Sequence, residues 1–383
     1  MIFAWFVLKV YVGSMGMKDK YRYIHLMPAA DSIFNVEFVK FVNMNFAPEE
    51  HLFVIFSSKA LPVFDEYRNV IIKDRLNLDV FNQIAPYSDS LFVHGLAFSA
   101  WELIRMRKEY ARKIIWCVWG HDLYRYSWGD AIKEHFSLKN LARWIYVRFL
   151  KLIWKLVDRK IACFKAGVAS FIKDCQLLKK RYPSLTVYNV VYPFGHYLNE
   201  LQSLECSCPK RRILLGHSAF PFLKHEKYLY LLQKYLHEDF QLVIPLTYGV
   251  LDYADRIEKK AKEIYGDRAL VIRESLSWID YAKLLKTIDV AIFDYRHQSA
   301  LGNIYLLLYL GKKIYLSGNG LIYNGLSDIG EGKNVKVYDC SDVGKVSYGQ
   351  FMFEHSEAGE GVEYARQFFD KSIVLAKWRE IFK

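Results

Sequence analysis

Residues 290–310 read VAIFDYRHQSALGNIYLLLYL, and this stretch decides the fold class. The first four residues are apolar and have the length and composition of a buried strand. A polar loop follows, and a strongly apolar helical segment begins at residue 301. A strand that ends in a polar loop and then enters a helix is typical of βαβ units in parallel sheets.

The same alternation extends along the chain in both directions. In the second half it predicts strands at 211–215, 240–244, 269–272, 290–293 and 313–316, with helices at 225–236, 252–265, 277–287 and 301–310. In the first half it predicts strands at 21–27, 51–56, 70–72, 90–94, 113–118, 160–164 and 186–191, with helices at 33–45 and 99–109. Helical spacing returns at 363–383. Two successive doubly wound series predict a GT-B fold, in which two Rossmann-like domains face each other across a cleft.

A polar stretch at 198–210, with two cysteines and a proline, marks the predicted linker. It separates an acceptor-side domain, 17–197, from a nucleotide-binding domain, 211–350, which a helical segment, 351–383, follows. The apolar residues 1–16 are predicted to be a tail or a misassigned start, because about 13 apolar residues are too few to span a bilayer.

Composition narrows the classes of function. Hydrophobic residues make up 52% and charged residues 25% of 383, which is the balance of a folded protein. The net charge of +12 favours an anionic partner, but no nucleic-acid-binding motif accompanies it. The six cysteines lack the paired spacing of a zinc site, so we expect no metal and a reducing cytoplasm.

Small and polar residues follow four strands of the second half. Because the carboxyl ends of parallel strands share one edge, these loops are predicted to bind the donor nucleotide. The opening of helix 301–310 is the most informative, since free N–H groups at a helix N-terminus suit a pyrophosphate. The predicted donor-binding residues are Gly216, His217, Ser218, Thr247, Tyr248, Glu274, Leu276, Arg296, Gln298, Ser299, Ala300, Leu301, Gly302 and Asn303.

Three residues of the first half are candidates for the catalytic base. Asp122 lies in a Trp-Gly-x-Asp loop after a strand and is the first choice, while His94 and Asp31 are reserves. Asp31 fits equally well as the N-cap of the following helix. His94 fits equally well as a buried, hydrogen-bonded histidine.

Basic and aromatic residues are interleaved between 133 and 181. A helix with cations on one side and Trp, Phe and Leu on the other is typical of anionic membrane surfaces, although it also suits a packing helix with a solvated basic face. The residues predicted to contact the membrane or the acceptor are Trp119, His121, Tyr124, Arg143, Trp144, Arg148, Lys151, Trp154 and Lys155.

With these motifs identified, the chain resembles the TDP-Fuc4NAc:lipid II Fuc4NAc transferases, glycosyltransferase family 56, known from enterobacterial common antigen synthesis. The resemblance is carried in order by the motifs His94-Gly95, WGxDLY from Trp119 to Tyr124, IL-x-G-x-S at 213–218, V-x-P-x-x-Y at 243–248, E-x-L with Y-x-x-LL at 274–285, and the helix opening at 298–303. WGxDLY is the most specific of these. Two features depart from the family pattern: Ser299, Ala300 and Asn303 stand where the family is richer in Gly and Thr, and His121 lies within WGxDLY.

The resemblance implies a GT-B enzyme that uses a dTDP-activated amino-dideoxy sugar without a required metal. It implies an undecaprenyl-diphosphate-linked glycan as the acceptor, at the cytoplasmic face of the bacterial inner membrane. Two alternatives stay open: a GT-B enzyme with another nucleotide sugar and a soluble acceptor, and a non-catalytic nucleotide- or membrane-binding protein. The choice of sugar, the stereochemistry and the oligomeric state are not readable from the residues.

Overall fold

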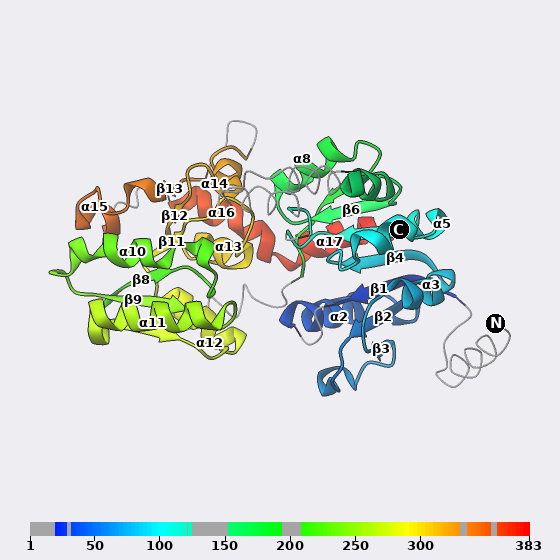
Figure 1. Ribbon diagram of the computed structural model, residues 1–383, viewed down its shortest axis with the longest axis horizontal. Coiled ribbons are helices and arrows are strands. Elements are labelled where there is room, and N and C mark those ends of the chain that lie inside the picture. Colours follow the sequence, from blue (N-terminus) through cyan, green and yellow to red (C-terminus); the bar gives the residue numbers. More distant parts are fainter. Residues whose placement is uncertain are drawn as a thin grey trace, which may run out of the picture. The chain divides into compact units, whose positions relative to one another are not determined.

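The computed structural model describes residues 20–28, 32–120, 122–124, 152–193, 208–329, 335–353 and 358–383. The chain divides into two compact units. Unit 1 comprises Met1–Gly195 and Lys377–Lys383, and unit 2 comprises His196–Ala376. Each unit is built around one parallel sheet with helices against it (Figure 1). The predicted pair of doubly wound α/β domains is therefore confirmed.

The sheet of unit 1 has the strand order β3-β2-β1-β4-β5-β6-β7, and every neighbouring pair is parallel. Its central strands are almost wholly buried, which is expected of a sheet that is covered on both faces. The strands are β1 (Tyr21–Met27), β2 (His51–Phe56), β3 (Val70–Lys73), β4 (Ser88–His94), β5 (Ile114–Cys117), β6 (Ala166–Ala169) and β7 (Thr186–Asn189). The helices with defined bounds are α2 (Ile33–Asn45), α3 (Leu78–Ile84), α4 (Ala100–Arg105), α5 (Lys108–Ala111) and α8 (Ile172–Arg181).

The sheet of unit 2 has the order β10-β9-β8-β11-β12-β13 and is likewise parallel. The order reverses between β8 and β11, and ligands of such folds bind beyond the strand ends at this point. The strands are β8 (Arg211–Leu215), β9 (Phe240–Pro245), β10 (Ala269–Ile272), β11 (Val290–Phe293), β12 (Lys313–Leu316) and β13 (Tyr338–Asp339). The helices are α10 (His225–Leu231), α11 (Leu251–Tyr265), α12 (Trp278–Lys286), α13 (Leu301–Tyr309), α14 (Leu321–Leu326), α15 (Tyr348–Phe353) and α16 (Ala358–Phe369).

The predicted strand at 160–164 is wrong. Residues 152–161 are helical, and the strand is β6, whose sequence is AGVA. A Cβ on Gly167 would lie 3.0 Å from Leu185 Cδ2 and 3.3 Å from Leu178 Cδ1. Small residues are therefore needed in this strand, and they carry little of the β-branched signal by which strands are recognised.

Two predicted helices are each divided into two. The helix at 99–109 is α4 and α5, which are separated at Met106 and Arg107. The helix at 363–383 is the end of α16 followed by α17 (Lys371–Ile381). Asp370 causes the break between α16 and α17. Its carboxylate accepts hydrogen bonds from the N–H groups of Ser372 and Ile373, at 2.8 and 3.3 Å, and therefore caps the start of α17.

Helix α17 returns the chain to unit 1. Trp378 is fully buried, and its indole Nε1 donates to the carbonyl oxygen of Val191 at 3.0 Å. Its ring packs edge-on against Phe38 of α2, with ring centroids 5.0 Å apart. The last residues of the chain therefore complete the core of unit 1. Among the described residues, no helix combines the length and apolar character needed to cross a bilayer.

Candidate functional site

Four loops meet at the carboxyl edge of the unit 2 sheet, which we call the unit 2 edge. They follow β8 (216–219), β9 (246–249), β10 (273–277) and β11 (294–300). Residues Ala219 and Gly249 of the first two loops form a parallel bridge. The switch point between β8 and β11 lies in the middle of this edge.

Gly216 allows the first loop to turn tightly. Its φ is +69°, and a Cβ there would lie 2.4 Å from Nε2 of the buried His225. A side chain at this position would be strained by both the backbone and the neighbour. The small residue predicted to let the loop approach a phosphate is therefore required by the fold as well.

His217 is the central side chain of the unit 2 edge. Its Nε2 lies 3.2 Å from the hydroxyl of Ser299 on the β11 loop, which joins two predicted donor-binding residues. Its Nδ1 is buried and has no hydrogen-bond partner among the residues that the structure describes. Burial lowers the pKa of His217 to about 4, so the ring is neutral at physiological pH. When Ser299 donates to Nε2, Nδ1 carries the proton and can donate to an anion.

Helix α13 begins beside this histidine. Ala300 at its N-cap has a left-handed conformation, with φ of +50°, and no side chain caps the helix. The Tyr295 hydroxyl donates to the Ser299 carbonyl oxygen at 2.7 Å, which holds the loop in place before the helix. A strained residue ahead of an uncapped N-terminus leaves backbone N–H groups available for a phosphate.

The other predicted donor residues lie around this centre. Ser218 is fully buried, with its hydroxyl beside that of the exposed Tyr248. Asn303 donates to the Tyr281 hydroxyl at 2.9 Å. Thr247, Gln298 and Gly302 are half-buried, Leu301 is buried, and Glu274, Leu276 and Arg296 are exposed.

Asp294 directly follows β11 and was missed by the sequence analysis. It is buried and binds the ammonium groups of Lys224, at 2.9 Å, and Lys227, at 3.0 Å, and the hydroxyl of Tyr228 at 2.8 Å. Burial by itself raises the pKa of Asp294, but these three hydrogen bonds outweigh it and lower the pKa to about 2. The carboxylate therefore fixes two half-exposed cations near the end of β11.

Asp122, the first candidate for the base, lies at the carboxyl edge of the unit 1 sheet, which we call the unit 1 edge. One carboxylate oxygen accepts from Leu96 N at 2.8 Å and Trp116 Nε1 at 2.6 Å. The other accepts from the N–H groups of Trp119 and Leu123, both at 3.1 Å. Four donors occupy a carboxylate with about four acceptor positions, so this geometry favours a role in positioning two loops over the role of base.

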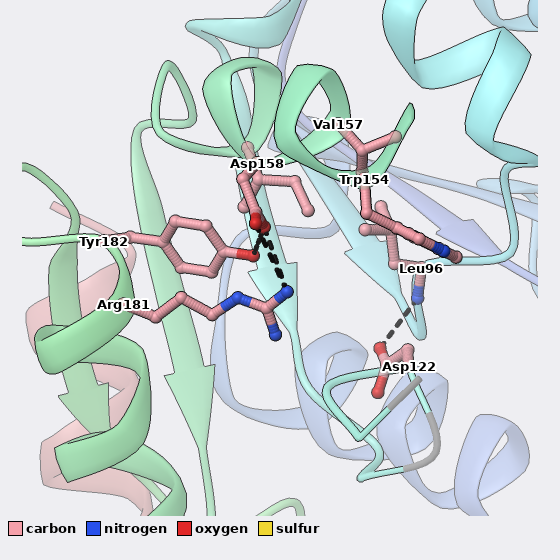
Figure 2. Close-up of a pocket in the computed structure, with 8 residues that line it drawn as sticks. Leu96, Asp122, Trp154, Val157, Asp158, Arg181 and Tyr182 are labelled. Atoms are coloured by element: carbon pink, nitrogen blue, oxygen red, sulfur yellow. Dashed lines mark hydrogen bonds and ion pairs between the residues drawn. The ribbon is translucent and has the colours of Figure 1, made fainter. Parts of the chain in front are cut away.

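A pocket lies next to Asp122 (Figure 2). Across it, Asp158 accepts from the Tyr182 hydroxyl at 2.6 Å and pairs with Arg181 at 3.1 Å. Half-buried Trp154 forms part of the wall, so it is directed into unit 1. Tyr124 is buried as well, and its hydroxyl donates to Asp174, whose pKa burial raises to about 7.

The remaining predicted residues of unit 1 have separate outcomes. His94 is fully buried and both ring nitrogens are engaged, as the alternative interpretation expected. Ser32 caps α2, so the capping role considered for Asp31 is taken by its neighbour. Trp119 is half-buried and Lys155 is exposed. Asp31, His121, Arg143, Trp144, Arg148 and Lys151 lie outside the described residues.

A buried row of histidines was also missed by the sequence analysis. His25, His51 and His94 occupy three neighbouring strands and are linked through their ring nitrogens. The signal was present, because each strand places its histidine two residues from an aromatic residue of the same face. Within the described residues, no group of three His, Cys, Asp or Glu side chains could hold a metal ion.

Two parallel α/β domains, the second with a polar edge at its switch point, define the fold class as GT-B. Among solved structures, the chain is similar to a glycosyltransferase from Rickettsia africae, at 16% identity over 96% of this chain and 98% of that one, with a TM-score of 0.59. It is similar to HepE from Anabaena in complex with UDP, at 10% identity over 94% and 99%, with a TM-score of 0.62. At these identities the likeness concerns the fold.

The family is settled by a direct sequence match. The model of the family described as 4-alpha-L-fucosyltransferase glycosyl transferase group 56 matches residues 24–330. The chain therefore belongs to glycosyltransferase group 56, and it is a glycosyltransferase. The resemblance that rested on WGxDLY and the other motifs is confirmed.

Proposed function

We propose that this chain transfers a Fuc4NAc-like amino-dideoxy sugar from a dTDP-activated donor to an undecaprenyl-diphosphate-linked glycan. The transfer takes place at the cytoplasmic face of the bacterial inner membrane, in the synthesis of a cell-surface polysaccharide. Membership of group 56 supports this choice of chemistry. The observation that carries the donor site is the buried, unpartnered Nδ1 of His217 beside the uncapped start of α13.

The diphosphate is the part of the donor that the unit 2 edge suits best. Backbone N–H groups at the start of α13 and Nδ1–H of His217 supply hydrogen-bond donors, and the helix dipole adds positive potential. These groups stabilise the negative charge that develops on the leaving diphosphate as the sugar moves. They do so without a metal, as the resemblance implied.

The nucleoside is assigned to the loops after β9 and β10. Thr247 and Tyr248 lie on the first of these loops, while Glu274 and Leu276 lie exposed on the second. The exposed Tyr248 and Leu276 offer apolar surface for a base, and Glu274 offers an acceptor for ribose hydroxyls. We assign Arg296, which is exposed on the loop after β11, to the phosphates.

The acceptor is assigned to unit 1. Asp122 holds the loops after β4 and β5 together, and Asp31, directly before the cap of α2, is our candidate for the base that deprotonates the acceptor hydroxyl. A base at that hydroxyl assists the attack on the sugar carbon.

The helical residues 152–161 support contact with a membrane. Spacing of three and four residues places Leu152, Lys155, Leu156 and Arg159 on one face, and all four are exposed. Ile153, Val157 and Ile161 form the buried face. Leucines interleaved with cations suit the headgroup region of an anionic bilayer.

A thermal-shift screen tests the donor. The full chain is heated with dTDP, UDP or GDP at equal concentration, and binding to the native state raises the melting temperature. We expect the largest shift with dTDP. A larger shift with UDP favours the alternative that a UDP-sugar is the donor, which HepE with bound UDP exemplifies in this fold.

A further inference from the structure

The row of histidines crosses the sheet of unit 1 diagonally. His51 Nδ1 lies 3.0 Å from His25 Nε2, and His25 Nδ1 lies 3.2 Å from His94 Nε2. In the strand register, His51 is level with Tyr23, and His25 is level with Phe92. Each step along the row therefore moves two residues toward the carboxyl ends of the strands, and the row ends at the unit 1 edge.

The row ends on a hydroxyl group. His94 Nδ1 lies 2.9 Å from the hydroxyl oxygen of Tyr192, which follows β7. Burial lowers the pKa of His94 and of His51 to about 3, and it lowers the pKa of His25 as well, so all three rings are neutral. A neutral imidazole has one donor and one acceptor nitrogen. The hydrogen bonds of the row must therefore all run in the same direction, and that direction decides whether Tyr192 donates to His94 or accepts from it.

Tyr192 stands where three loops of the unit 1 edge converge. Its ring lies 6.2 Å from that of Trp119 in the loop after β5, and 6.5 Å from that of Phe34 in the first turn of α2. It stacks on Phe38, with centroids 4.9 Å apart, so the ring is held firmly. The residue as a whole is half-buried, but burial beside Cys117 raises the pKa of its phenol well above the ordinary value, so the hydroxyl keeps its proton. The three histidines behind it are fully buried.

A purely structural role explains this arrangement poorly. The rings around the row are aromatic: Phe53 and Phe92 both stack on His25 with centroids 4.7 Å apart. An apolar ring at position 25 would fill the same space, whereas buried polar groups cost free energy unless every one is paired. The row pairs both ring nitrogens of His25 and of His94, and its last member binds a hydroxyl at the edge where ligands of this fold bind.

We propose that Tyr192 is a hydrogen-bonding contact for the acceptor glycan, and that His94 and His25 are positioning residues that set the direction of its hydroxyl group. The proposal rests on the proposed function in one respect, the assignment of the acceptor to unit 1. One bond to His94 leaves the phenol oxygen with capacity for a second partner. That second bond is made to a hydroxyl or amide group of the acceptor.

The first test replaces Tyr192 by Phe, which keeps the ring and removes the hydroxyl. The matched control is Tyr110→Phe on α5, away from the row, which removes the hydroxyl of a buried residue that accepts a hydrogen bond from Arg107. We expect Tyr192→Phe to raise the KM for the acceptor by about tenfold, the effect of one lost hydrogen bond. The KM for the donor and the thermal shift with nucleotide stay as in the wild type. An acceptor KM equal to that of the control overturns the proposal.

The assay uses a glycan linked to undecaprenyl diphosphate and the same glycan without the lipid. Turnover of the free glycan alone contradicts the lipid acceptor of the proposed function. The comparison of Tyr192→Phe with Tyr110→Phe is then made on the free glycan. A failure of the lipid-linked acceptor can therefore be distinguished from a failure of the Tyr192 contact.

The second test addresses the row itself. His25→Phe interrupts it while leaving Tyr192 and His94 in place, and we expect the acceptor KM to rise about threefold. In the double variant with Tyr192→Phe, the change at His25 should add nothing, because both act through one hydroxyl. Additive effects contradict a positioning role for His25.

Nitrogen-15 NMR of the wild-type histidine side chains keeps the row testable if His25→Phe fails to fold. Neutral rings with one protonated nitrogen each, in a single tautomer, support the row. Rings that exchange between tautomers like free imidazole overturn it.

Discussion

The carboxyl edges of the two sheets are built in opposite ways. At the unit 1 edge, Asp122 accepts hydrogen bonds from four N–H donors, and both ring nitrogens of His25 and of His94 are hydrogen-bonded. At the unit 2 edge, His217 keeps a buried nitrogen without a partner and α13 begins without a capping side chain. An edge that satisfies its own polar groups holds loops in place, whereas an edge that leaves them unsatisfied is prepared for a ligand.

Lowering the pH should produce the largest difference in stability between the two units. A histidine whose pKa is lowered by folding does not weaken the protein above about pH 6.5, because the ring is neutral in both the folded and the unfolded state. Below that pH the unfolded state binds a proton that the folded state does not. Each such histidine therefore lowers the free energy of unfolding by about 1.4 kcal/mol per pH unit.

Among the described residues, unit 1 holds three such rings, with pKa values near 3 for His51 and His94. Asp174 offsets one of them, because its pKa is raised to about 7 and its protonation favours the folded state over the same range. Unit 2 holds His217 and His225, near 4 and 3, and His297, whose pKa is also lowered, while its shifted carboxylates Glu258 and Asp294 have lowered pKa values and offset nothing. We expect unit 2 to unfold first between pH 6 and 4, as followed by hydrogen exchange. Unit 1 opening first would contradict this.

Asp122→Asn should have the next largest effect. The amide has one oxygen to serve four donors and adds two N–H groups, so buried N–H groups lose their partners. We expect a loss of about 2–4 kcal/mol in the free energy of unfolding, with transfer activity falling in parallel. Chemical denaturation measures the loss. Wild-type stability together with abolished kcat would instead identify Asp122 as the base.

Asn303→Asp should affect the unit 2 edge without destabilising it. The change keeps the shape and places a negative charge in the first turn of α13, which favours the helix in the free protein. The same charge repels a diphosphate, so we expect the Kd for dTDP to rise tenfold or more. Gln233→Glu, at an exposed position between α10 and the start of β9, is the control. Equal dTDP affinities of Asn303→Asp and Gln233→Glu would show that the diphosphate does not bind at the start of α13.

Lys155→Gln should give the smallest effect. One cation near an anionic membrane surface contributes about a fivefold change in partitioning, which vesicle sedimentation measures. Lys108→Gln, at an exposed position of α5, makes the same charge change elsewhere on unit 1. If both variants bind anionic vesicles alike, the face formed by Leu152, Lys155, Leu156 and Arg159 is not the membrane contact.

Much of the fold could be predicted because strands such as β8 and β11 are apolar runs between polar loops. The pattern failed at β6, where Leu178 and Leu185 require small residues, and at Asp370, whose cap divides a continuous helical pattern. The donor loops were predicted from strand ends alone. The hydrogen-bond partners of Asp122 and His94 were not, because they come from other strands and loops that only the folded chain brings together.

Hydrogen exchange with and without dTDP tests the contrast between the two edges most directly. The account predicts slower exchange at 216–219 and at 294–303, with the loops at 94–98 and 119–124 unchanged. Protection confined to the loops of unit 1, or no protection at the start of α13, would contradict it.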